Sequence, residues 1–171
     1  MTGFRIAVTG TPGVGKTSFC AQAKWTATCV KILAEKHDCI DPIDEDESMP
    51  IDIEQLVEKL NWSGDDILLI DGHLSHLLPV DAIILLRCHP DTLRNRLISR
   101  EYSVEKINEN IECELIGVIS AECQELPCLE LDSDNGLEAM IADAERWITD
   151  GFKPHRPNEP IDWIAQIHGD D

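Results

Sequence analysis

Residues 8–19, VTGTPGVGKTSF, decide the fold, because they join a short apolar run to a helical pattern through a glycine-rich loop. Gly10, Gly15, Lys16 and Thr17 match the spacing G-x-x-x-x-G-K-[ST], with a strand expected before the loop and a helix after it. Glycines let successive backbone N–H groups turn inward, and the helix N-terminus adds further free donors. A plain glycine turn beside a surface lysine is the alternative, but the match in this context favours a phosphate-binding loop.

The side chains that would act with this loop follow from the needs of a phosphate site. Lys16 can reach β- and γ-phosphate oxygens, and the Thr17 hydroxyl can bind Mg²⁺. Such loops use a second carboxylate, at the end of a neighbouring buried strand, to hold the metal. Asp71 closes the apolar run ILLID and is the candidate. His73 follows two residues later, with a catalytic and a structural role both open, whereas we expect His76 to be structural.

Strand-like and helix-like segments alternate along the chain, which predicts a parallel α/β sheet. The expected strands are residues 4–10, 26–30, 65–73, 81–87 and 127–132, and the expected helices are 18–25, 31–37, 53–60, 91–100, 103–123 and 137–148. Asp52 and Ser103 are the expected N-caps of two of these helices. The long helix 103–123 places Ile107, Ile111, Leu115 and Val118 on one stripe. Residues 151–171, with three prolines, are typical of an extended linker that ends in a short apolar turn.

Composition limits the class of protein. The chain has 171 residues, which suits one domain, and no apolar run approaches the ~20 residues of a membrane span. Its seven cysteines are an odd number without a C-x-x-C pair, which does not resemble zinc ligation. Several sit in apolar runs, so we expect reduced thiols and a cytoplasmic protein, or a nuclear one in a eukaryotic cell. A net charge of −19 opposes nucleic-acid binding and would attract a basic protein. The acidic surface could equally serve solubility or salt tolerance.

Four blocks of sequence resemble the adenylate kinase isoenzyme 6 family, the coilin-interacting nuclear ATPase proteins and their archaeal counterparts. They are RIAVTGTPGVGKT, the D-x-H of IDGHLSHLLP, LLRCHPDTLRNRL and REYSVEKINENIECELIGVI. The likeness runs from about residue 4 to 150. It implies a P-loop NTPase fold of nucleoside monophosphate kinase type: a three-layer parallel sheet with helices on both faces. Within a domain of residues 1–150, it implies a monophosphate-binding segment near 31–52 and a lid at 99–109, with 151–171 as a tail.

The resemblance also implies a function. Family members transfer a phosphoryl group from ATP to AMP, giving two ADP, with broad monophosphate tolerance. They also hydrolyse ATP and assist small ribosomal subunit maturation and rRNA processing by engaging a basic small-subunit ribosomal protein. Carried over by motif, the ATP-binding residues are Gly13, Gly15, Lys16, Thr17, Ser18 and Arg100, the metal residues for Mg²⁺ are Thr17 and Asp71, and the catalytic residues are Lys16, Asp71, His73 and Arg100.

The chain departs from the family at the monophosphate site. Where the family has an arginine in an L-A-R context, residues 33–36 read LAEK, and no lysine or arginine follows from residue 37 to 58. Lys36 is the candidate replacement, although a point charge lacks the bidentate geometry of arginine. The alternative function is therefore an ATPase switch that binds a ribosomal protein and has weak or no monophosphate kinase activity. A small-metabolite kinase would need another acceptor pocket, to which no motif points.

Overall fold

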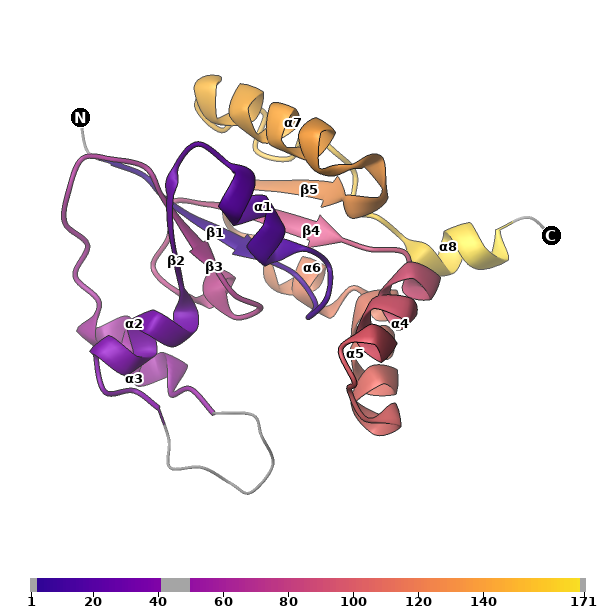
Figure 1. Cartoon of the computed structure of the whole chain (residues 1–171). Coiled ribbons are helices and arrows are strands. Elements are labelled where there is room, and N and C mark those ends of the chain that lie inside the picture. The colour runs from indigo at the N-terminus through magenta and orange to yellow at the C-terminus, as the bar shows by residue number, and fades with distance from the viewer. Residues whose placement is uncertain (1–2, 41–49, 170–171) are drawn as a thin grey trace.

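The structure is a computed structural model that describes residues 3–40 and 50–169. In this part of the chain, parallel strands form one sheet in the order β2-β3-β1-β4-β5 (Figure 1). The strands are β1 (Arg5–Thr9), β2 (Thr26–Cys29), β3 (Leu68–Asp71), β4 (Ala82–Arg87) and β5 (Cys128–Asp132). All five lie within the expected strand segments, because each is an apolar or β-branched run of the kind that a parallel sheet buries.

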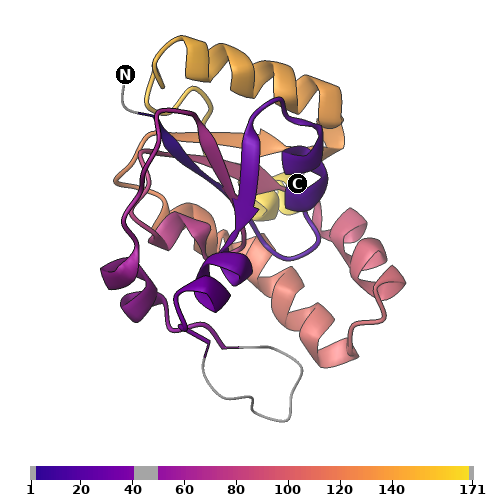
Figure 2. The same ribbon diagram turned by 60° about the vertical axis from the view of Figure 1, so that its left-hand side comes forward.

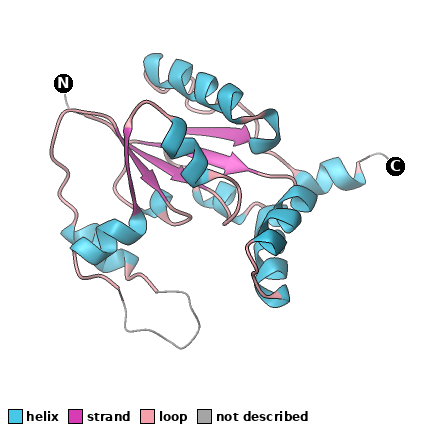
Figure 3. Cartoon of the chain, viewed as in Figure 1, coloured by secondary structure: helices cyan, strands magenta, loops and turns pink. Residues whose placement is uncertain are grey.

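Helices cover both faces of this sheet. They are α1 (Lys16–Gln22), α2 (Val30–Lys36), α3 (Ile53–Lys59), α4 (Pro90–Ser99), α5 (Val104–Ile116), α6 (Val118–Glu122), α7 (Leu137–Thr149) and α8 (Trp163–His168), with short 3₁₀ turns η1 (Ser75–Leu77) and η2 (Ser133–Asn135). Figure 3 shows the same elements coloured by type. Successive side chains of a strand point to opposite faces. Ile6 and Val8 of β1 therefore enter the core with α1, α4 and α7, and Ala7 enters the core with α2, α3 and α6. The three-layer fold is confirmed.

The predicted long helix 103–123 is wrong as a single helix. It ends at Gly117, which has a φ of +77° and caps α5 by donating from its N–H to the Cys113 carbonyl at 3.1 Å, and α6 starts anew. Glycine adopts this left-handed conformation at no steric cost. The break rotates Val118 out of the expected stripe, so that it is 41% exposed, while Ile107 and Ile111 stay buried.

Both predicted N-caps are present. The Asp52 carboxylate accepts a hydrogen bond from the Gln55 N–H at 3.0 Å, and the Ser103 hydroxyl accepts one from the Lys106 N–H at 3.2 Å. Each side chain satisfies one of the free amides in the first turn of its helix. Residues 38–50 are rich in Asp and Glu, and the sequence predicts an acidic loop there. Most of this acidic loop, residues 41–49, lies outside the described residues. Among the described residues, no helix has the length and apolar character needed to cross a bilayer.

The C-terminal segment differs from the expected linker. It runs beside β5, where the Cys128 N–H donates to the His155 carbonyl and the Asn158 amide donates to the Glu130 carbonyl, both at 2.8 Å. It then enters α8, whose first residue, Trp163, is 1% exposed. Figure 1 shows α8 in yellow beside α4, at the carboxyl ends of β4 and β5. Residues 151–162, which contain the three prolines, form no helix or strand, but they still pack beside the sheet.

Candidate active site

The loop between β1 and α1 depends on glycines for two reasons. Gly10 and Gly13 have φ values of +147° and +95°, a region that side chains rarely adopt. A Cβ at Gly10 would lie 2.5 Å from the Leu86 carbonyl oxygen, and one at Gly13 would lie 2.9 Å from the Leu93 Cδ1 atom. The loop is thus tightly packed on β4 and α4. Figures 1 and 2 both place it between the α2–α3 pair and the α4–α5 pair.

The Lys16 side chain is hydrogen-bonded to the backbone of this loop. Its Nζ atom donates hydrogen bonds to the Gly10 carbonyl at 2.8 Å and to the Thr11 carbonyl at 3.1 Å. Burial lowers the pKa of Lys16 from 10.5 to about 8, the Asp71 carboxylate opposes the shift, and the Arg100 charge adds to it. A phosphate group would stabilise the ammonium that burial destabilises. The site therefore favours an anion.

Thr17 and Asp71 meet at the mouth of the loop. Parallel pairing of β1 with β3 places Asp71 level with Val8, at the carboxyl end of β3. From there its Oδ2 atom accepts a hydrogen bond from the Thr17 hydroxyl at 2.9 Å. These two hard oxygens fit Mg²⁺, which keeps several water ligands and is usually bound through one or two carboxylates and substrate phosphates. The described residues contain no cluster of three or more His, Cys, Asp or Glu able to hold a metal.

The two histidines after Asp71 have different surroundings. His73 is exposed and lines the cavity described below. Partial desolvation there, followed by the charge of Lys16, lowers its pKa. His76 is buried in η1, with its Nδ1 atom 2.8 Å from the Thr9 hydroxyl and its Nε2 atom 3.5 Å from Glu122. Burial lowers the pKa of His76 as well, against the raising effect of Glu122. The placement of His76 supports the structural role expected of it.

A cavity of about 530 Å³ opens in front of the loop. Its lining includes Gly13, Gly15, Lys16, Thr17, Ser18, Gly72, His73, Arg100, Tyr102, Lys106 and Asn110. A second hollow of about 340 Å³ shares the loop and Arg100 with the first, and adds Arg96, Ser133 and Gly136. Arg96 also donates to the Gly13 carbonyl at 3.2 Å. The structure therefore gathers the expected ATP-binding residues around one loop, with Asp71 joined to them through Thr17.

Lys36 is the expected site residue that the structure does not bring to this place. It is exposed on α2 and lines neither hollow. By contrast, Tyr102, Lys106 and Asn110 line the cavity from α5 and the turn before it. Sequence reasoning placed the first two only within the expected lid and missed Asn110. Asn110 Nδ2 is buried and has no hydrogen-bond partner among the described residues. The spacing of Lys106 and Asn110, four residues apart on one helix face, was a signal that could have found them.

Comparisons with known proteins agree with this geometry. A family model described as "AAA domain" matches residues 6–117. A protein of Archaeoglobus fulgidus named "Putative adenylate kinase" is 39% identical over 171 residues, covering 95% of this chain and 93% of the relative. A protein of the same name from Pyrococcus furiosus is 37% identical over 177 residues, covering 92% and 90%.

The similarity to solved structures is one of fold. A gluconokinase from Sinorhizobium meliloti superposes with a TM-score of 0.55 at 15% identity, covering 88% of this chain and 94% of the other. A shikimate kinase from Bacteroides thetaiotaomicron superposes with a TM-score of 0.51 at 14% identity, covering 85% and 98%. The chain belongs to the family of archaeal adenylate kinases of the isoenzyme 6 type, and is a P-loop phosphotransferase of the nucleoside monophosphate kinase class.

Proposed function

We propose that this protein transfers the γ-phosphoryl group of Mg·ATP to the phosphate of a nucleoside monophosphate, with AMP as the first acceptor, giving two ADP. The bond from the γ-phosphorus to the β–γ bridging oxygen breaks, and a bond from that phosphorus to an acceptor phosphate oxygen forms. The proposal rests on one arrangement. The buried Lys16 ammonium and the Thr17–Asp71 hydrogen bond occur together at the mouth of a cavity of about 530 Å³. Phosphoryl transfer needs positioning and charge compensation, and these residue types supply both.

Each residue has a proposed role. Gly13, Gly15, Lys16, Thr17 and Ser18 bind the ATP phosphates, Thr17 and Asp71 hold Mg²⁺ directly or through water, and Arg100 contacts ATP from the lid at residues 99–109. Mg²⁺, when bound, neutralises charge on the β- and γ-phosphates. The second hollow, bordered by Arg96, Arg100 and the turn after β5, is the proposed place for the rest of the ATP molecule.

The acceptor phosphate needs its own cation. Lys36 is the candidate on α2, but it is exposed and outside the cavity, so contact requires α2 to approach the phosphate loop. Lys106 lines the cavity and is the competing cation. We expect Lys36→Ala to raise the KM for AMP by about tenfold, the typical cost of one charge-assisted contact, without changing the KM for ATP. A raised KM for AMP in Lys106→Ala and not in Lys36→Ala would reassign the acceptor site.

We also propose that ATP is hydrolysed when water replaces the acceptor. His73, beside Asp71, is the proposed group that orients the attacking water. The competing function is mainly an ATPase switch that binds a basic ribosomal protein in small-subunit maturation and rRNA processing. The net charge of −19 supports such a partner. All seven cysteines lie in the described part and are free thiols, which supports a reducing compartment such as the cytoplasm.

One experiment separates the two functions. ADP and inorganic phosphate are measured from ATP and Mg²⁺, with and without AMP, in the unaltered protein and in Lys16→Ala. A kinase forms two ADP for each ATP consumed when AMP is present, with little phosphate. An ATPase switch releases one phosphate for each ADP, with or without AMP, and that outcome would contradict the kinase proposal. Equal rates in Lys16→Ala would contradict a role of this loop in either reaction.

A further inference from the structure

Three charged side chains are buried together behind the phosphate loop. Arg87 at the end of β4, Glu114 on α5 and Glu130 on β5 are each at most 3% exposed. The Arg87 guanidinium donates to a Glu114 carboxylate oxygen at 2.8 Å and to a Glu130 carboxylate oxygen at 2.5 Å. Two carboxylates share one cation here, so each needs further donors to compensate for the loss of water.

Glu114 connects three parts of the chain. Its Oε1 atom accepts hydrogen bonds from Arg87 Nε, from the Cys88 N–H at 3.0 Å and from the Trp163 indole N–H at 3.0 Å. Its Oε2 atom accepts a hydrogen bond from the Thr11 hydroxyl at 2.7 Å. One oxygen is therefore fixed by the sheet and the C-terminal segment, and the other holds the phosphate loop.

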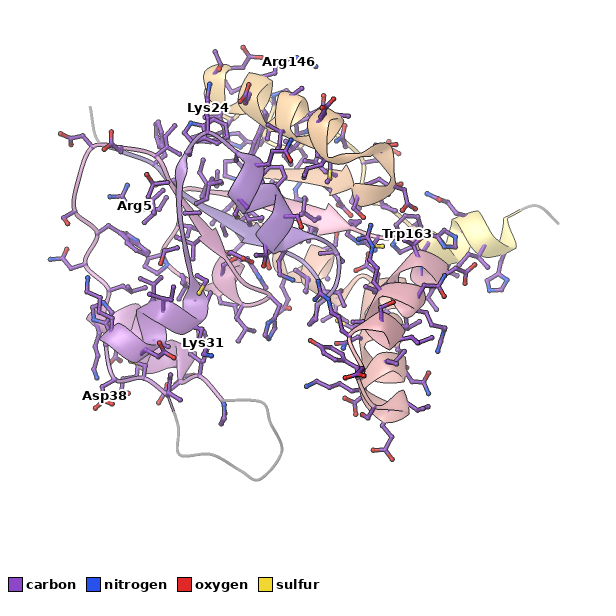
Figure 4. The ribbon with its side chains drawn as sticks, in the orientation of Figure 1. Arg5, Lys24, Lys31, Asp38, Arg146 and Trp163 are labelled. Atoms are coloured by element: carbon purple, nitrogen blue, oxygen red, sulfur yellow. The ribbon has the colours of Figure 1, made fainter. Side chains whose placement is uncertain are left out.

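The C-terminal segment supplies several of the hydrogen bonds that compensate these buried charges for the loss of water. The Trp163 indole donates to Glu114, the Ile161 N–H donates to Glu130 at 3.1 Å, and the Ile161 carbonyl accepts from Arg87 at 3.0 Å. The Trp163 ring also lies 5.8 Å from the Arg87 guanidinium. Figure 4 shows Trp163 at the end of α8 that faces the tip of β4. Without these groups, two buried carboxylates would each lose a donor.

Thr11 connects this hydrogen-bond network to the phosphate loop. It is 1% exposed, and its carbonyl accepts hydrogen bonds from Lys16 Nζ at 3.1 Å and from the Val14 N–H at 3.3 Å. The position of Thr11 therefore fixes the positions of the Val14 amide and the Lys16 ammonium. Lys106 and Asn110, which line the cavity, lie eight and four residues before Glu114, on the same side of α5.

We propose that Trp163 is a positioning residue of the phosphate site, acting through Glu114 on Thr11. Among the described residues, none of the C-terminal segment lines either hollow. The Trp163 indole N–H nevertheless orients the Glu114 carboxylate that holds the loop. Removing this donor leaves Glu114 Oε1 with two of its three donors, so the carboxylate can tilt and loosen Oε2 from the Thr11 hydroxyl. The consequence is weaker binding of ATP phosphates beyond any loss of stability.

The chain offers a matched control in a second buried tryptophan. Trp147 is 4% exposed, and its indole donates to the Pro154 carbonyl of the same C-terminal segment at 2.8 Å. Trp163→Phe and Trp147→Phe each remove one buried N–H donor and keep an aromatic ring. Thermal unfolding and the calorimetric Kd for Mg·ATP are measured for both variants. We expect similar losses in Tm, but a Kd raised about tenfold in Trp163→Phe and changed less than about twofold in Trp147→Phe.

A double-mutant cycle tests the route through Thr11. Thr11→Val removes the hydroxyl that Glu114 holds, and Thr11→Ser keeps a hydroxyl there. We expect Thr11→Val to raise the Kd for Mg·ATP about as much as Trp163→Phe and Thr11→Ser to stay near the unaltered value. In the Thr11→Val background, most of the effect of Trp163→Phe should disappear. Additive effects, or equal Kd changes in the two tryptophan variants, would overturn the proposal. The inference rests on the ATP site proposed above, which fails separately if the unaltered protein does not bind Mg·ATP.

Discussion

The Thr17 hydroxyl donates to the Asp71 carboxylate at 2.9 Å, although the two residues are 54 positions apart in the chain. The contact joins the first turn of α1 to the carboxyl end of β3. It places two oxygen-bearing side chains, the proposed Mg²⁺ ligands, near the buried ammonium of Lys16.

Asp71→Asn should raise the Mg²⁺ concentration needed for half-maximal activity by about 10- to 100-fold, since the amide has no charge to offer the ion. The neutral side chain can still accept the Thr17 hydrogen bond, so the fold should be retained. Activity is titrated with Mg²⁺ at saturating ATP. Asp65→Asn, an exposed carboxylate before β3, is the control and should leave the titration unchanged. An unaltered Mg²⁺ requirement in Asp71→Asn would exclude this carboxylate from the metal site.

Lys16→Ala should reduce phosphoryl transfer and hydrolysis together by at least about 10²-fold, because it removes the cation that compensates developing charge on the phosphates. Both activities are measured on purified protein with an unchanged circular dichroism spectrum. Lys24→Ala, an exposed lysine just after α1, serves as the control. Near-normal ATPase turnover in Lys16→Ala would contradict the assignment of the loop.

The buried ammonium also predicts a pH dependence of stability. Burial lowers the pKa of Lys16 from 10.5 to about 8, so between these values the unfolded chain binds a proton that the folded chain does not. The free energy of unfolding should therefore rise with pH across this window, by about 3 kcal/mol in total from this group. Urea unfolding of the unaltered protein and of Lys16→Met at pH 8 and 10.5 measures the difference. Parallel pH profiles in the two proteins would mean that Lys16 is not destabilised by burial.

His73→Ala should lower ATP hydrolysis by about 10²-fold while the Kd for Mg·ATP stays within a few-fold. Partial burial and the Lys16 charge lower the pKa of His73, so its imidazole is neutral at pH 7 and can orient water. Single-turnover hydrolysis and calorimetry separate the two quantities. His155→Ala, exposed in the C-terminal segment, is the control. Loss of ATP binding in a folded His73→Ala protein would indicate a structural role instead.

The acidic loop predicts a salt-dependent interaction with a basic protein. Eleven acids occur in residues 38–66, with Lys59 as the sole lysine or arginine: Asp38, Asp41, Asp44, Glu45, Asp46, Glu47, Asp52, Glu54, Glu58, Asp65 and Asp66. Changing the four acids at 44–47 to Asn and Gln should slow association with a lysine-rich ribosomal protein and flatten its salt dependence. ATP affinity should stay the same, because short-range contacts hold the phosphates. An unchanged on-rate and salt slope would mark this loop as plain solvated surface. These four positions lie outside the described residues.

The phosphate loop could be predicted because its structure depends on local chemistry. Positive φ values at Gly10 and Gly13, and the helix that starts at Lys16, follow from a few consecutive residues. The strand ending at Asp71 was also readable, because a buried parallel strand is a continuous apolar run with its first acid at the carboxyl end. Gly117 was a readable signal that the long-helix prediction overlooked, since it adopts the left-handed conformation that ends helices.

Sequence alone thus determined the fold class, the phosphate loop and the identity of most proposed ATP-site residues, because strand periodicity and glycine conformation act over short stretches. Tertiary structure alone decided that Lys36 stays exposed and that Lys106 and Asn110 face the cavity. It also decided that the proline-rich C-terminal segment docks on the sheet. Glu114 meets Thr11 across 103 positions and Trp163 across 49. Such contacts depend on how β4, α5 and the C-terminal segment pack in space, and a buried carboxylate takes whichever donors that packing brings within reach.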